Sequence, residues 1–124
     1  MAQIGYICIG TNNFEKAQVF YDGLLAEIGG KRIMPTPPGM LYSAGKGAML
    51  MLCRPHDGKH ATFGNGTMIA IQADSKEQVA SLHAKALSLG ATTEGEPGPR
   101  GTFGDFAYFR DLDGNKLAVF FTGR

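Results

Sequence analysis

The sequence has no tryptophan and only two cysteines, Cys8 and Cys53, in 124 residues. Two cysteines this far apart do not suggest a disulfide framework, so we expect free, buried thiols and a cytoplasmic, reducing location. No apolar run approaches the ~20 residues of a membrane span, and no basic segment followed by an apolar one begins the chain. The sequence therefore predicts a soluble protein without a membrane partner.

An excess of charge of one sign is also missing, because 12 basic residues are balanced by 11 acidic ones. No basic stripe is available to neutralise phosphates, and we predict no nucleic-acid partner. The length is that of one domain. The 18 glycines favour many tight turns over a helical bundle.

The first half of the chain reads as one strand, one helix and three strands. Residues 2–10 alternate, with Ile7 and Ile9 on one face. An apolar stripe at helical spacing follows from residue 14 to 25, with asparagine caps before it and glycines after it. Short strands are then expected near 31–35, 39–44 and 47–53.

The same order restarts 62 residues later, where Ile69 and Ile71 occupy the places of Ile7 and Ile9. Ser75 and Gln78 form a capping box for a second helix. Strands are expected near 92–95, 105–110 and 115–122, the last two joined by the polar turn Asp111–Gly114.

The predicted fold class is α+β, with two tandem βαβββ modules that form a curved mixed sheet cup with the helices outside. We expect one domain over residues 1–124, with module one at 1–54, a linker at 55–66 and module two at 67–124. Each module alone is too small to bury its own sheet, so the two modules must pack together.

Five segments in this order resemble the vicinal oxygen chelate superfamily, in its glyoxalase, bleomycin-resistance and dioxygenase branch. The resemblance covers almost the whole chain and implies the same tandem fold. Two departures fall in loops: Leu112 stands where a proline is usual, and the segment from Arg100 to Arg110 is short. The segments are Phe20-Tyr21, 54–58 (RPHDG), 64–67 (GNGT), 96–100 (EPGPR) and 110–116 (RDLDGNK).

Enzymes of this superfamily hold one divalent metal through His, Glu or Gln on the first and last strands of each module. The resemblance assigns these positions to Tyr6, Leu50, Met68 and Ala118. None offers an imidazole or a carboxylate, and a phenol ligates only after losing a proton of pKa ~10. We therefore predict no metal site and no cofactor.

Other potential donors have ordinary structural interpretations. His56 and His60 lie in a loop-like segment, where solvated side chains are expected, and His83 is predicted on the exposed side of the second helix. Asp111 and Asp113 could act as a carboxylate pair, but a turn with Gly and Asn uses such residues to satisfy its own backbone. Cys8 could be a nucleophile only beside a base or cation, and cavity lining is favoured.

Strand alternation predicts an apolar concave face that binds a small molecule through a few polar groups. On the opposite face, Met49, Met51 and Val119 are predicted to pack under the helices. Neighbouring side chains or a partner chain could instead fill the concave face. The predicted ligand-binding residues are Tyr6, Cys8, Leu50, Leu52, Met68, Gln72, Arg100, Tyr108, Ala118 and Phe120.

Three functional hypotheses follow. The favoured one resembles the bleomycin-resistance mode, in which a metal-free cup binds a small apolar or aromatic molecule without chemistry. The alternative is a lactoylglutathione lyase-like enzyme, or another lyase, isomerase or dioxygenase, with a non-standard site and Tyr6 as acid or base. A third is an interaction protein with an occluded cup. The residues favour a binding protein over an enzyme, and we expect a homodimer.

Overall fold

The computed structural model describes residues 1–123, and residue 124, the end of the predicted second module, lies outside the described residues. Each half contains one strand, one helix and three strands, as predicted. The first half comprises β1 (Tyr6–Gly10), α1 (Phe14–Ala26), β2 (Arg32–Thr36), β3 (Gly39–Tyr42) and β4 (Met49–Cys53). The second comprises β5 (Ile69–Gln72), α2 (Lys76–Ser88), β6 (Thr92–Pro99), β7 (Asp105–Arg110) and β8 (Lys116–Phe121).

The strands form two four-stranded mixed sheets with the same topology. Sheet one has the order β1-β4-β3-β2 and sheet two the order β5-β8-β7-β6. In each sheet the first strand pairs in parallel with the last, and the remaining pairs are antiparallel. The fold is therefore the predicted pair of βαβββ modules, although β6 extends to Pro99, beyond the 92–95 predicted for it.

The helices begin and end where the sequence signals indicate. The side chain of Asn13 accepts the N–H of Lys16 at the start of α1. At α2 the hydroxyl of Ser75 accepts the N–H of Gln78, whose side chain accepts the N–H of Asp74. These bonds satisfy backbone donors that have no partner inside a helix.

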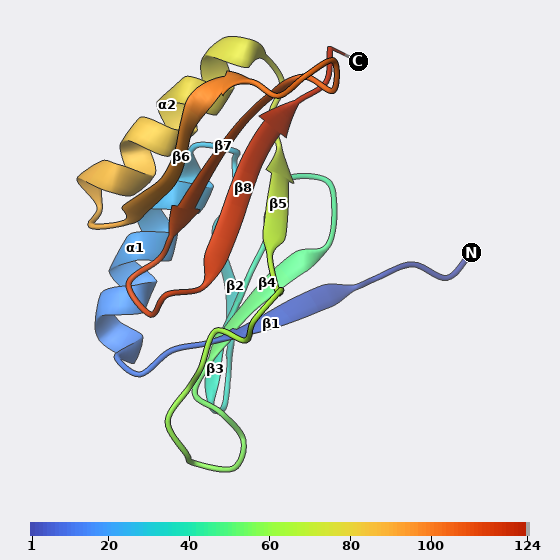
Figure 1. Cartoon of the computed structure of the whole chain (residues 1–124). Coiled ribbons are helices and arrows are strands. Elements are labelled where there is room, and N and C mark those ends of the chain that lie inside the picture. Colours follow the sequence, from blue (N-terminus) through green and yellow to red (C-terminus); the bar gives the residue numbers. More distant parts are fainter. Residues whose placement is uncertain (124) are drawn as a thin grey trace.

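One hydrophobic core joins both modules. It combines the buried faces of α1 and α2 with side chains of both sheets, including Leu52 of β4 and Val119 of β8. The helices contact each other, and in Figure 1 both lie on the same side of sheet two, while β1 and the N-terminus extend away from them. No helix within residues 1–123 is long and apolar enough to cross a membrane.

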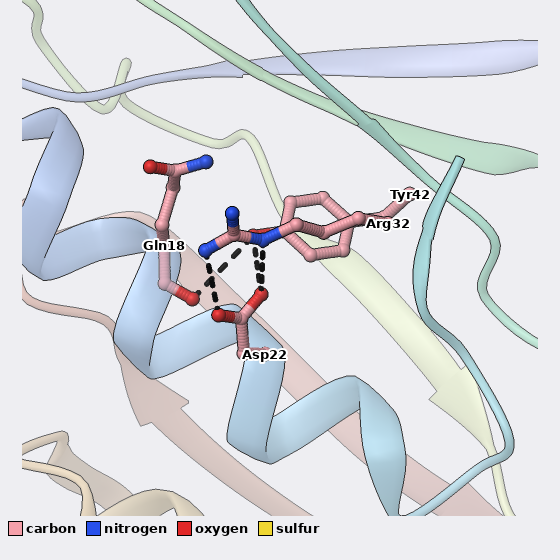
Figure 2. A network of polar contacts seen from close by, with 4 residues as sticks. All are labelled: Gln18, Asp22, Arg32 and Tyr42. Carbon is pink, nitrogen blue, oxygen red and sulfur yellow. Dashed lines mark hydrogen bonds and ion pairs between the residues drawn. The ribbon is translucent and has the colours of Figure 1, made fainter. Parts of the chain in front are cut away.

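A polar network fixes α1 to the edge of sheet one (Figure 2). Arg32 of β2 donates two hydrogen bonds to the carboxylate of Asp22, at 2.9 and 2.8 Å. The hydroxyl of the buried Tyr42 donates to the same carboxylate at 2.9 Å. The hydrogen bond from Arg32 lowers the pKa of Asp22, and burial raises the pKa of Tyr42.

The predicted exposure of His83 is wrong. His83 is 2% exposed, and its Nε2 lies 2.9 Å from the hydroxyl of Thr93. At 100° per residue, position 83 lies on the same helix face as Val79, Leu82 and Ala86, which are all buried. The imidazole therefore continues the apolar stripe that anchors α2 to sheet two.

Candidate functional site

Sheet one turns one face toward α1 and leaves the other, its open face, away from the helices. Tyr6 and Cys8 of β1 lie on the open face, paired in register with Met49 and Met51 of β4. The thioether of Met51 accepts the hydroxyl of Thr36 at 2.8 Å. By register and strand alternation the open face carries Tyr6, Cys8, Met34, Thr36, Leu41, Met49, Met51 and Cys53.

The prediction that Leu50 and Leu52 lie on this concave face is wrong. Leu50 pairs with Ile7 and Leu52 with Ile9, and both leucines are buried in the core, at 5% and 0% exposure. Met49 and Met51, predicted under the helices, take the open face instead. The segment Met49–Cys53 is apolar at every position, so its composition does not show which face is buried.

The open face of sheet two follows the predicted alternation. Ala70 and Gln72 of β5 pair with Ala118 and Phe120 of β8, and Ala118 is fully buried between its neighbours. Met68 precedes β5 and is 44% exposed. Tyr108 pairs with Ala118 and Phe106 with Phe120, which adds two aromatic rings to this face.

Aromatic rings form a continuous row on the open face of sheet two. The rings of Phe106 and Phe120 are stacked with centroids 5.4 Å apart, and those of Phe106 and Tyr108 are stacked at 6.2 Å. The guanidinium of Arg100 lies 5.7 Å from the centre of the Tyr108 ring, so the structure brings these two predicted ligand-binding residues together. Lys116, which the sequence analysis did not single out, lies 5.2 Å from the same ring.

Cys8 and Cys53 lie on adjacent parallel strands and line one small cavity. Both are free, but Cys8 is exposed, contrary to the prediction of two buried thiols. Burial, followed by the nearby thiol of Cys8, raises the pKa of Cys53. Within residues 1–123 no cation or imidazole acts to lower that pKa, so this geometry does not create an activated nucleophile at Cys53.

The two modules share a cavity of about 1000 Å³ beside β5. Its walls come mostly from the helix side of the sheets, including Ile7, Ile69 and Leu117. Leu50 and Gln72 are the predicted ligand-binding residues that line it. The others, Tyr6, Cys8, Leu52, Met68, Arg100, Tyr108, Ala118 and Phe120, do not, so one chain does not gather the predicted site into a single pocket.

The residues at the superfamily's metal positions do not fit a divalent cation. Because Leu50 faces the core, β4 presents Met49 and Met51 beside Tyr6 on the open face. The second module presents Met68 and Ala118. Thioethers, a phenol and a methyl group provide no set of hard or borderline donors. Among residues 1–123, no three His, Cys, Asp or Glu side chains converge as a metal site would require.

The remaining polar candidates are exposed loop residues or have structural partners. His56 and His60 lie in an exposed loop, as predicted, and Nε2 of His60 is 3.2 Å from the side-chain amide of Asn12. Asp111 accepts the N–H groups of Asp113 and Asn115, which is the predicted turn role. Sequence reasoning missed the contribution of Phe106, although its place two residues before Tyr108 on a strand was a usable signal.

The comparisons with known proteins agree with this architecture. The sequence model of the Glyoxalase/Bleomycin resistance protein/Dioxygenase superfamily matches residues 3–119, so the chain belongs to that superfamily. A search of curated proteins found no match.

Among solved structures, a glyoxalase/bleomycin resistance protein from Albidiferax ferrireducens T118 is 32% identical, with a TM-score of 0.85 over 95% of this chain and 97% of that one. A glyoxalase/bleomycin resistance protein/dioxygenase family enzyme from Burkholderia phytofirmans PsJN is 19% identical, with a TM-score of 0.81 over 98% and 99%. A lactoylglutathione lyase from Agrobacterium tumefaciens is 20% identical, with a TM-score of 0.74 over 98% and 94%. The last two show similarity of fold.

Proposed function

We propose that this chain is a cytoplasmic, homodimeric binding protein that holds a small apolar or aromatic molecule without a metal. One observation carries the proposal: each sheet leaves large apolar side chains exposed on its open face. Tyr6 and Met34 of sheet one are 55% and 51% exposed, and Met68 beside sheet two is 44% exposed. Contiguous apolar surface of this kind marks interaction or ligand sites.

A second copy supplies what one chain lacks. Within residues 1–123 the open faces contribute little to the shared cavity, Met49 from sheet one and Ala70 and Gln72 from sheet two, and β1 and β5 are edge strands of their sheets. Similar proteins build their cups from pairs of modules contributed by one or two chains. A twofold axis would set the open face of sheet one in each chain against that of sheet two in the other, enclosing two equivalent cups.

The lining suits an apolar ligand. Burial of a flat molecule against methionine and aromatic side chains yields about 25 cal/mol per Å², from which association costs remove a large part. Micromolar affinity is the expected result. Flexible thioethers adapt to ligands of varied outline, which favours a broad range of partners over a single one.

The test is a calorimetric screen of apolar and aromatic metabolites and drugs against the purified protein. Met68→Glu should weaken the hits by about 1.5 kcal/mol or more, because it buries an unpaired carboxylate. Tyr6→Phe should cost about 1 kcal/mol, through loss of one orienting hydrogen bond. Val19→Glu, at an exposed apolar position of α1, is the matched control and should change nothing.

The proposal fails if Met68→Glu leaves the affinity of every hit unchanged, because the ligands then lie outside the open faces. It also fails if the screen yields no saturable binding at any ligand. Either result would leave the fold assignment intact, since that depends on the sheets and not on the ligand.

A further inference from the structure

Two cations lie over one aromatic ring on the open face of sheet two. The guanidinium of Arg100 is 5.7 Å, and the ammonium of Lys116 5.2 Å, from the centre of the Tyr108 ring. All three side chains are partly exposed. A ring that is already in contact with cations keeps them near apolar surface, where their charge is less screened than in bulk water.

Arg100 is held in this position by the backbone of β6. Nη1 donates to the carbonyl of Gly98 at 3.0 Å and to that of Pro99 at 3.3 Å, and Nη2 donates to the carbonyl of Glu96 at 2.8 Å. Its Nε–H donates to none of the described residues. The side chain is thus oriented before any ligand arrives, which reduces the entropy lost on binding.

Glycine at position 95 makes this arrangement possible. A Cβ there would lie 2.9 Å from Cδ2 of Tyr108 and 3.3 Å from Nη2 of Arg100. The absence of a side chain at Gly95 leaves room for the guanidinium beside the strand and the ring. The carbonyl groups near the end of β6 therefore hold the Arg100 side chain, and the glycine at position 95 leaves space for it.

Neither Arg100 nor Lys116 forms an ion pair with any residue of the described range 1–123. The ion pairs among the described residues join Arg32 to Asp22, Arg54 to Glu15 and Arg110 to Glu94. Arg110 is the next residue along this face of β7, and its pairing with Glu94 at 3.1 Å shows that a neighbouring cation is compensated. The face therefore keeps two positive charges next to the row formed by Phe106, Tyr108 and Phe120.

We propose that this face selects anions, and specifically flat aromatic carboxylates. The aromatic part would pack against Phe106 and Phe120, whose rings are stacked 5.4 Å apart, and the carboxylate would reach Arg100 and Lys116. A guanidinium with a free N–H is a suitable donor to a carboxylate, since such charge-assisted bonds are the strong ones. The inference rests on the proposed function, because it names the class of ligand for the same site.

Naphthoate and its neutral isostere naphthamide are the probes. Calorimetry on the full-length protein should show naphthoate binding about tenfold more tightly than naphthamide. Added sodium chloride should weaken the binding of naphthoate but not that of naphthamide, because salt screens the exposed charges. Arg100→Met should remove about tenfold of the naphthoate affinity and change naphthamide by less than about twofold.

Arg54→Met is the matched control, since Arg54 also lies over a ring, that of Phe14 at 4.9 Å, but outside this face. Arg100→Met loses three hydrogen bonds to β6, so thermal unfolding and near-ultraviolet circular dichroism must first show that it folds. If it does not, Lys116→Met gives the same comparison through a side chain with no hydrogen bond in the described structure.

Equal affinity for naphthoate and naphthamide would overturn the inference while leaving the proposed function standing. An equal fall in the affinity for both probes in the folded variants would also overturn it, because the cations would then support the shape of the site and would not attract the carboxylate. Absence of binding by either probe also overturns it. The proposed function itself is contradicted only if the whole screen yields no binding, or if Met68→Glu weakens the binding of no hit.

Discussion

The buried hydroxyl of Tyr21 on α1 donates a hydrogen bond to the carboxylate of Asp111, in the turn between β7 and β8. The same carboxylate accepts the side-chain amide of Asn115, which also donates to the carbonyl of Gly10 at the end of β1. One turn of the second module is thereby bonded to the helix and the first strand of the first module. This contact fixes how the two modules pack.

We expect Tyr21→Phe to lower the free energy of unfolding by about 1–3 kcal/mol, because a buried carboxylate loses its hydroxyl donor. Urea unfolding followed by circular dichroism measures the change. Tyr108→Phe, whose hydroxyl makes no hydrogen bond in the described residues, is the control and should stay within about 0.5 kcal/mol of the wild type. Equal effects of the two variants would mean that the bond to Asp111 contributes nothing.

Stability should also fall at alkaline pH because of Tyr21. Burial, then the charge of Asp111, raises its pKa well above 10.0 in the folded protein. Below pH ~10 both states keep the proton, but above it the unfolded chain ionises first and is favoured. The free energy of unfolding should therefore drop by up to about 1.4 kcal/mol per pH unit for this group. Tyr21→Phe should show a shallower decline in the same urea titrations.

The order of elements was predictable because local signals agreed with one another. Alternation in β1 and β5, the capping box at Ser75 and the polar turn at Asp111 each specify structure within a few residues. His83 was misplaced because imidazole occurs on both polar and buried faces, and its partner Thr93 comes from a different element. That hydrogen bond became visible only in the tertiary structure.

The candidate site was only half predictable. On β8 the predicted strand alternation put Ala118 and Phe120 on the correct face. On β4 every residue is apolar, so the sequence did not show which face is buried. The register of β4 with β1 decides which of its residues face the helices. That register depends on contacts between residues far apart in the sequence, so it could not be predicted locally. Lys116 escaped notice because a lysine at a strand start normally reads as a solvated residue.

Gly39 should be intolerant of a side chain. A Cβ at this position would overlap the carbonyl oxygen of Leu52 and lie 2.8 Å from the Cβ of Cys53 on the neighbouring strand. We expect Gly39→Ala to destabilise the protein by about 2 kcal/mol or more in urea unfolding. Gly47→Ala meets no atom within 4 Å and should be nearly neutral. Comparable stability of the two variants would contradict the close packing of β3 on β4.

The two thiols should differ in reactivity. Cys8 is exposed, whereas Cys53 is partly buried and its pKa is raised by burial and by the Cys8 thiol. Because the thiolate is the nucleophile, Ellman's reagent near pH 8 should modify Cys8 about tenfold faster than Cys53. Cys53→Ser should keep only the fast phase and Cys8→Ser only the slow one. One rate for both cysteines would show that the chain exposes them equally.

The last prediction concerns assembly. If a second copy covers the open face of sheet one, a charge placed there must be desolvated when the dimer forms. Light scattering at micromolar concentration should give twice the mass of one chain for the wild type. Met34→Glu, at a 51% exposed position of β2, should raise the dimer dissociation constant by about tenfold or more. Val19→Glu, at a 66% exposed position of α1, should leave it unchanged, since that helix surface lies away from the open faces. A monomeric wild type, or equal dissociation constants for the two variants, would mean that the apolar surface of sheet one is not the interface.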